Sequence, residues 1–372
     1  MIYLDNSATT KPNEACVEAM KLALTDVWGN PSSVHSFGME AEKLLRHARE
    51  QVAAALGAEK ERVFFTSGGT EADNWAIFSA VQRLGKRGKH IITTAVEHHA
   101  VLSCMEKLSQ QGFEVTYLQP DALGRISVED LEKHLRADTI LVSCMMVNNE
   151  TGAVLPIRDM VRVTRKKSPL ALFHTDAVQG FGKIPFSAKT LGADMISVSA
   201  HKVHGPKGVG ALYIRAGLPL PPFVMDGGQE QNYRSGTENL PGIVGFGAAV
   251  AAQDFAVDRE KMTTLIAAFR AELSQVEGLE ILGAGDAPHI LSVSLPGFRS
   301  QGILNCLQDK GFYVSAGSAC SRGHRSHVLT AMGLSPKTVD GAVRISIDAS
   351  TPASAPAQLA DAFRYAKATL KG

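Results

Sequence analysis

Lys202 is a candidate for a nucleophilic amine. It follows the apolar run Met195–Ser199 in the stretch MISVSAHKVHGPKG, which predicts a strand that ends just before it. A lysine at the mouth of an apolar strand end can have its pKa lowered by desolvation, and its amine then becomes a nucleophile that forms a Schiff base. An ordinary surface lysine is the alternative. Lys207, in the Gly/Pro turn that follows, is a rival candidate but lies farther from the strand end.

Asp176 follows a second predicted strand, residues 171–175, in the stretch LFHTDAVQG. Burying a carboxylate is unfavourable unless a cation or several donors pair with it, so Asp176 needs a partner. The alternative is that Asp176 caps the helix that follows.

The stretch VFFTSGGTEADN leads from a third predicted strand into a helix through Ser67, Gly68, Gly69 and Thr70. Such small residues let backbone amides point at an anion at the helix N-terminus, where the macrodipole favours a phosphate. The motif is neither GxGxxG nor a Walker loop, and plain turn chemistry is the alternative.

Taken together, these strand ends resemble the fold-type I enzymes that depend on pyridoxal phosphate (PLP), whose ring acts as an electron sink. The resemblance narrows to the NifS/IscS-type cysteine desulfurases of the class V aminotransferase family. It covers nearly the whole chain through the motifs YLDNSATT, GNPSSVH, TSGGTEADN, EHHA, VNNETG, HTDAVQ, SAHKVHGPKG, RSGTEN and GSACS.

The resemblance implies a role for each matching residue of the cofactor site. The phosphate is held by Gly69, Thr70, Ser199, His201 and, from the other subunit of a homodimer, Thr237. His98 stacks on the pyridine ring and moves protons, and Asp176 contacts the ring nitrogen. Asn149 and Gln179 contact the ring substituents, and Lys202 binds the cofactor aldehyde.

The resemblance also implies the reaction. Arg344, with Asn149, binds the carboxylate of L-cysteine, a task suited to a planar guanidinium; a surface ion pair is the alternative for Arg344. Cys320 attacks the substrate sulfur, which leaves a persulfide on the enzyme and releases alanine. We further hypothesise that Arg322, His324 and Arg325 lower the pKa of the Cys320 thiol.

The acceptor of the sulfur is left open by the resemblance. The segment that follows Cys320 is shorter than in the IscS type, so an iron–sulfur scaffold protein and a tRNA-thiolation enzyme are both candidates. A selenocysteine lyase, a related PLP aminotransferase and a catalytically idle PLP-fold scaffold are the competing functions.

The elements that must position these residues alternate along the first two thirds of the chain. Strands are predicted at 62–66, 90–94, 114–118, 140–147, 171–175, 195–199 and 210–214. Helices are predicted at 71–84, 100–111 and 156–167. This alternation predicts an α/β fold with a largely parallel sheet covered on both faces by helices, in which ligands bind at the carboxyl ends of the strands.

After Thr237 the pattern changes to that of a smaller α+β unit. Helices are predicted at 240–255, 258–276, 301–310 and 357–370, and strands at 279–282, 290–294 and 343–347. We therefore expect a large PLP-binding domain at 1–250 and a small domain at 251–372 that carries the cysteine loop. The first 15 or so residues are expected to pack with the small domain.

The composition excludes several other classes of protein. The 372 residues include 38 Lys+Arg and 37 Asp+Glu, so the charge balance favours neither nucleic acid nor a membrane surface as a direct partner. No apolar run approaches the roughly 18 residues that a bilayer requires, and the first ten residues do not resemble a targeting signal, so we expect a cytoplasmic protein. Five cysteines without a CxxC pair argue against disulfides and zinc, and His99, His204 and His327 lack metal-ligand spacing.

Overall fold

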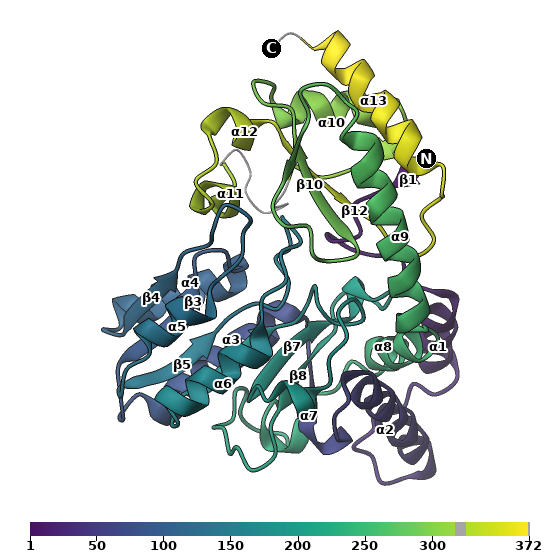
Figure 1. Ribbon diagram of the computed structural model, residues 1–372. Coiled ribbons are helices and arrows are strands. Elements are labelled where there is room, and N and C mark those ends of the chain that lie inside the picture. The colour runs from purple at the N-terminus through teal and green to yellow at the C-terminus, as the bar shows by residue number, and fades with distance from the viewer. Residues whose placement is uncertain (317–324, 371–372) are drawn as a thin grey trace.

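A seven-stranded sheet forms the lower half of the molecule in Figure 1, a computed structural model that describes residues 1–316 and 325–370. Its strands are, in spatial order, β2 (Val63–Thr66), β8 (Gly210–Ile214), β7 (Met195–Ser199), β6 (Leu172–Asp176), β5 (Thr139–Ser143), β3 (His90–Thr94) and β4 (Glu114–Leu118). Strand β8 runs antiparallel to both of its neighbours, and the pairs from β7 to β4 are parallel. The predicted α/β fold with a largely parallel sheet is therefore confirmed.

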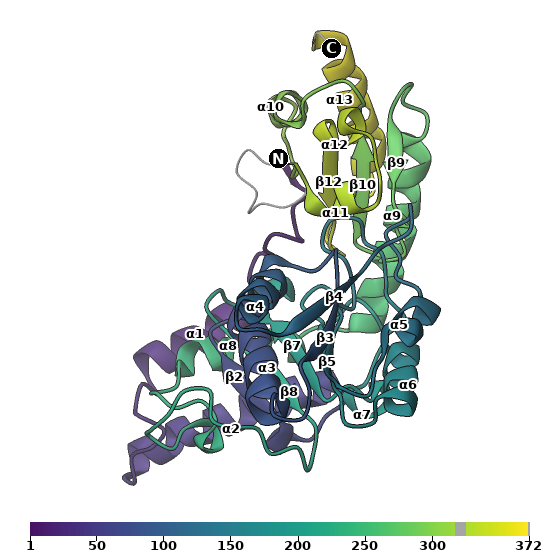
Figure 2. The ribbon, with the colours of Figure 1, turned by 90° about the vertical axis from the view of Figure 1, so that its left-hand side faces the viewer.

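Helices cover both faces of this sheet because apolar residues occupy both faces of its strands. In β2, Phe64 packs with α3 (Gly69–Leu84) and α4 (His99–Gln110), whereas Phe65 packs into the core on the opposite face. That opposite face is covered by α2 (Ser36–Leu56), α5 (Val128–His134), α6 (Ile157–Lys167), α7 (Ala188–Leu191) and α8 (Leu240–Ala251). Figure 2 shows α3 and α4 on one side of the sheet and α5 and α6 on the other.

Helix α8 packs against both α1 (Glu14–Thr25) and α2. Gly247 allows the close approach of α8 to α2, since a Cβ atom there would lie 2.6 Å from the Cα atom of Ala48. No single helix in the described part of the chain has the length and apolar character to cross a membrane. Among the described helices, only α8 and α9 (Phe255–Leu273) taken together are long and apolar enough, and the two are bent by 70° at their junction.

A second, antiparallel sheet forms the upper half of the molecule in Figure 1, in the order β12 (Ala342–Ser346), β10 (Ile290–Ser294) and β9 (Glu280–Leu282). It shares one apolar core with α9, α10 (Ser300–Asp309) and α13 (Ala355–Thr369). Two short helices, α11 (His327–Ala331) and α12 (Pro336–Asp340), precede β12. The division of the chain near residue 250 stays a prediction.

The start of the chain lies in this upper half. Strand β1 (Ile2–Tyr3) pairs in parallel with β11 (Phe312–Tyr313), and Leu4 belongs to the apolar core there. Asp5 then forms a parallel bridge with Ser346 at the end of β12. Residues 5–10 continue down to the seven-stranded sheet, where the backbone amide of Thr10 donates to the carbonyl of His201 (2.8 Å).

The strand predicted at 140–147 is too long. Strand β5 ends at Ser143, although residues 144–147 are apolar and buried. The amide of Asn148 donates to the carbonyl of Ala153, and Val147 bridges Val154, so this segment belongs to a buried turn rather than to the sheet. An apolar run of this kind indicates burial, and it does not distinguish a strand from a buried loop.

Candidate active site

A cavity of about 270 Å³ lies between the carboxyl ends of the parallel strands and β12. The residues predicted for the site that line it are Gly69, Thr70, His98, Asn149, Asp176, Gln179, Ser199, His201, Lys202 and Arg344. Lys207, the rival of Lys202, lines an adjoining open hollow instead. Cys320 lies outside the described residues, and Thr237 is exposed on the surface of the chain, in a different hollow.

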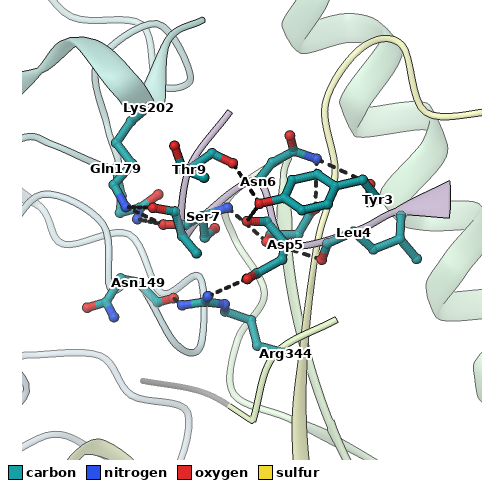
Figure 3. Close-up of polar contacts among 12 residues, drawn as sticks. Tyr3, Leu4, Asp5, Asn6, Ser7, Thr9, Asn149, Gln179, Lys202 and Arg344 are labelled. Atoms are coloured by element: carbon teal, nitrogen blue, oxygen red, sulfur yellow. Dashed lines mark hydrogen bonds and ion pairs between the residues drawn. The ribbon is translucent and has the colours of Figure 1, made fainter. Parts of the chain in front are cut away.

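Lys202 reaches the cavity because β7 ends at Ser199 and the chain then makes one 3-10 turn, η2 (Ala200–Lys202). Its Nζ atom donates to the carbonyl oxygens of Ser7 (2.5 Å) and Ala8 (2.8 Å), in the segment that arrives from β1 (Figure 3). The amine is therefore positioned by backbone atoms rather than by a carboxylate in these two contacts.

Asp176 ends β6 and is buried at the cavity wall, where its Oδ1 atom accepts from the amide of Val178 (2.8 Å). Burial raises the pKa of Asp176 to about 7, and the neighbouring carboxylate of Asp73 contributes to the increase. Asp176 thus makes a capping contact and is also buried at the cavity. The two interpretations from the sequence, a helix-capping residue and a buried carboxylate that needs a partner, therefore do not exclude each other.

Asp73, on the first turns of α3, is a second buried carboxyl at the same cavity. Its Oδ1 atom lies 3.5 Å from Nε2 of His174 and has no hydrogen-bond partner among the described residues. His174 in turn contacts the hydroxyls of Ser143 and Ser197, each at 2.9 Å. Burial raises the pKa of Asp73 to about 7 and lowers that of His174 to about 4, so a neutral imidazole stands between the hydroxyls.

His98 is the N-cap residue of α4, and its Nδ1 atom accepts from the amide of Ala100 (3.1 Å). Burial, with the charge of Lys202 as the next contribution, lowers the pKa of His98 to about 4, so the ring is neutral at pH 7. Since Nδ1 is an acceptor, the proton of the neutral ring is on Nε2. The cavity therefore has an uncharged N–H donor on this side.

The N-terminus of α3 forms the other end of the cavity. A Cβ atom on Gly69 would lie 2.6 Å from Cγ2 of Val178, so the close approach of these segments requires glycine. The hydroxyl of Ser199 is buried and has no hydrogen-bond partner in the part of the chain that the structure describes. A helix N-terminus and an unpartnered hydroxyl together form a site where an anion can accept hydrogen bonds.

Arg344, in the middle of β12, is almost fully buried at the cavity and is not a surface residue. Its Nη2 atom donates to Oδ1 of Asp5 (2.8 Å), and its Nη1 atom donates to the carbonyl of Asn149 (2.8 Å). The alternative considered from the sequence, a surface ion pair, is wrong, because the pair exists but is buried and faces the cavity.

The residues that flank the cysteine segment are held beside the cavity. On one side, Ser315 pairs with Arg344 through both backbone hydrogen bonds (3.2 and 2.7 Å). On the other side, the hydroxyl of Ser326 donates to Glu150 (2.5 Å), and His327 lines the cavity. Arg325, expected to act on the thiol, forms a bidentate pair with Asp340 at 2.7 and 2.8 Å.

Asp5, Asp73 and Glu150 line or contact the site and were not identified from the sequence. Each lies inside a motif that was identified, YLDNSATT, TSGGTEADN or VNNETG. For Asp73 a signal existed, because Ala76, Ile77 and Ala80, three, four and seven residues later, predict an apolar helix face on which a carboxylate is unusual. No local pattern distinguishes Asp5 or Glu150.

Comparisons with known proteins agree with this geometry. The class-V aminotransferase family model matches residues 2–354. A cysteine desulfurase from Nostoc sp. strain PCC 7120 is 43% identical over 354 residues, which cover 93% of this chain and 88% of that protein. A solved NifS-like protein superposes with a TM-score of 0.92 at 39% identity, over 99% of this chain and 100% of that one. SspA, solved in complex with cysteine, superposes with a TM-score of 0.84 at 34% identity, over 93% and 99%.

Proposed function

The chain belongs to the class-V aminotransferase family and is a PLP-dependent enzyme, and from this premise we propose that it is a cysteine desulfurase. The observation that carries the proposal is the gathering of a strand-end lysine, a strand-end aspartate and a buried arginine around one cavity. The reaction of an amino acid on PLP requires an amine that binds the cofactor, an acidic partner for the ring nitrogen and a group that binds the carboxylate.

The described residues fit PLP. The helix N-terminus at Gly69 and the unpartnered hydroxyl of Ser199 suit a phosphate, with Thr70 and His201 beside them. Asp176 suits a protonated ring nitrogen, which would hold the carboxylate in its ionised form although burial opposes ionisation. When bound, PLP withdraws electrons from the amino acid that is joined to it, so that bonds next to the amino acid's nitrogen weaken.

The side chains around the cavity have separate roles in binding the cofactor and in proton transfer. Lys202 would bind the cofactor aldehyde, and the carbonyls of Ser7 and Ala8 accept hydrogen bonds from its free amine. His98 would stack on the ring and hold or give up a proton at Nε2, while Gln179 and Asn149 would contact the ring substituents. Their location around one cavity supports these roles.

Arg344 binds the carboxylate of L-cysteine, with Asn149 beside it, and Cys320 receives the sulfur. An S–S bond forms as the C–S bond breaks, and the electron pair of the C–S bond stays on the carbon. That carbon then gains a proton and leaves as L-alanine. The described residues that flank the cysteine segment support this role, because Ser315 pairs with Arg344 and Ser326 contacts Glu150 at the cavity.

Mass spectrometry tests this proposal. After incubation with L-cysteine in the absence of reductant, the peptide that contains Cys320 should gain one sulfur atom, and the protein should release alanine. Cys320→Ser should abolish both signals, whereas Cys306→Ser, at a buried cysteine of α10, should behave as the wild type.

Two outcomes would contradict it. Undiminished alanine release by Cys320→Ser would exclude the persulfide and favour a selenocysteine lyase or an aminotransferase. A purified protein without the absorbance of lysine-bound PLP after PLP is added would favour a catalytically idle scaffold.

We further propose that the persulfide sulfur passes, in the cytoplasm, to an acceptor protein of iron–sulfur cluster assembly or of tRNA or cofactor thiolation. Transfer of labelled sulfur from L-cysteine to an isolated scaffold protein, compared with transfer to a thiolation enzyme, distinguishes the two. The acceptor that takes label only from the form with an intact Cys320 is the functional one.

We also propose a homodimer in which Thr237 completes the phosphate site of the other subunit. In this chain Thr237 is exposed and lines a surface hollow with Trp28 and Pro31. Trp28 is 67% exposed and Val34 is 95% exposed, which leaves an apolar surface that a second copy would cover. Light scattering should show a dimer, Trp28→Glu should give monomers that bind PLP weakly, and Thr237→Ala should weaken PLP binding without dissociation. A monomer that binds PLP tightly would contradict this.

A further inference from the structure

Asp5 and Arg344 form an ion pair at the cavity wall (Figure 3). The distance from Arg344 Nη2 to Asp5 Oδ1 is 2.8 Å, and the side chains of Arg344 and Asp5 are 3% and 22% exposed. Nη1 of Arg344 donates to the carbonyl of Asn149 (2.8 Å), while its Nε atom is buried without an acceptor among residues 1–316 and 325–370. Nη1 and Nη2 of the guanidinium thus each donate one hydrogen bond to the protein, and the remaining N–H groups are available to a ligand.

The backbone around Asp5 fixes where its carboxylate can reach. The amide of Ser346 donates to the carbonyl of Leu4 (2.7 Å), and the amide of Asn6 donates to the carbonyl of Ser346 (3.1 Å). Asp5 therefore lies opposite Ser346, two residues along β12 from Arg344. The hydroxyl of Tyr3 also donates to the carbonyl of Asp5 (3.1 Å).

The same segment continues to the lysine. The carbonyl of Ser7 accepts from Lys202 Nζ (2.5 Å) and from Nε2 of Gln179 (2.9 Å). The amide of Ser7 donates to the hydroxyl of Ser346 (2.9 Å), so the segment is bound to β12 at the level where it meets the lysine. Residues 5–8 thus connect the groups that face the two ends of an amino acid, its carboxylate and its amine.

We propose that Asp5 is a positioning residue, which holds the guanidinium of Arg344 in the orientation that accepts the α-carboxylate of the substrate. The inference rests on the proposed function, because that function assigns the carboxylate to Arg344. A guanidinium binds a carboxylate best in a bidentate arrangement, and a long side chain keeps that arrangement only if its orientation is fixed. Asp5 and the carbonyl of Asn149 provide that restraint.

Ligand binding to the PLP-loaded enzyme tests this without turnover. The absorbance of bound PLP is followed during titration with L-alanine and with ethylamine, two ligands that differ only in the carboxylate. Asp5→Asn should raise the dissociation constant of L-alanine about tenfold and that of ethylamine less than about twofold. Asp5→Glu, which keeps the charge, should restore part of the affinity for L-alanine.

Control variants separate positioning from a general structural effect. Asp286→Asn removes a carboxylate of similar exposure, 29%, that pairs with Arg125 away from the cavity, and it should change neither dissociation constant. In an Arg344→Lys background, Asp5→Asn should change the dissociation constant of L-alanine little further, because the two residues act through one contact.

Two results would overturn the proposal. One is an equal loss of affinity for L-alanine and ethylamine in Asp5→Asn, which indicates a general disturbance of the site. The other is tighter binding of L-alanine, which indicates that Asp5 competes with the substrate for Arg344. Because L-alanine and ethylamine require no sulfur transfer, a wild type that fails to release alanine from L-cysteine would refute the proposed function and leave this test readable.

Discussion

Replacing Asp73 with asparagine should change how the stability of the cofactor-free protein depends on pH. Burial raises the pKa of Asp73 from 3.8 to about 7, so the folded chain holds this proton more tightly than the unfolded chain does. The resulting stability is complete below pH 3.8 and is lost as the pH rises through 7. A tenfold difference in proton affinity between the two states corresponds to about 1.4 kcal/mol, so the wild type should lose about 2–3 kcal/mol through this group between pH 5 and pH 8.

The variant lacks this loss. The difference in unfolding free energy between Asp73→Asn and the wild type should therefore grow by about 2–3 kcal/mol, in favour of the variant, from pH 5 to pH 8. Removing the charge of Asp73 also lowers the pKa of Asp176, which acts in the same direction. Urea unfolding at fixed protein concentration and at four pH values measures the difference. Asp361→Asn, at an exposed aspartate paired with Arg364 (2.6 Å), serves as the control and should show a constant difference. A constant difference for Asp73→Asn as well would refute the reasoning.

Two further predictions concern stability and cofactor binding. Asp194, which has no exposed surface, accepts from Arg165 (2.5 Å) and Arg215 (2.7 Å), so Asp194→Ala should lower the unfolding free energy in urea by about 3–5 kcal/mol, and Arg215→Ala by less than half of that. Gly69→Ala places a methyl group 2.6 Å from Val178 at the N-terminus of α3, so PLP titration should show a dissociation constant raised about tenfold; an unchanged constant would exclude close packing there.

The parts of the site that sequence could predict are those that local pattern determines. Strands β7 and β10 have the predicted bounds, because a short buried run that contains Ile and Val and ends at a serine has few other interpretations. Lys202 and Asp176 then follow from the rule that ligands bind at the carboxyl ends of parallel strands. The helix bounds differ from the predicted ones by up to four residues at an end. Helix α9, for example, begins three residues earlier than predicted, where the side chain of Asp254 caps its first turn.

The parts that sequence could not predict depend on contacts between distant residues. The hydrogen bond between Asp5 and Arg344 joins positions that are 339 residues apart, and nothing near either residue indicates the other. Helices α1 and α2 were not identified, since they lie outside the strand–helix alternation on which the prediction depends. Glu150 meets Ser326 only because the turn after β5 and the start of α11 come together at the cavity.

The pairing of Ile2 with Phe312 and of Asp5 with Ser346 affects the order of events during synthesis. These residues find their partners only after the more than 300 residues between them have been translated, and closing so long a loop slows the final assembly of the fold. The nascent seven-stranded sheet can form earlier from local βα units. Because Arg344 lies in β12, a nascent chain arrested before β12 lacks the guanidinium that pairs with Asp5 at the cavity.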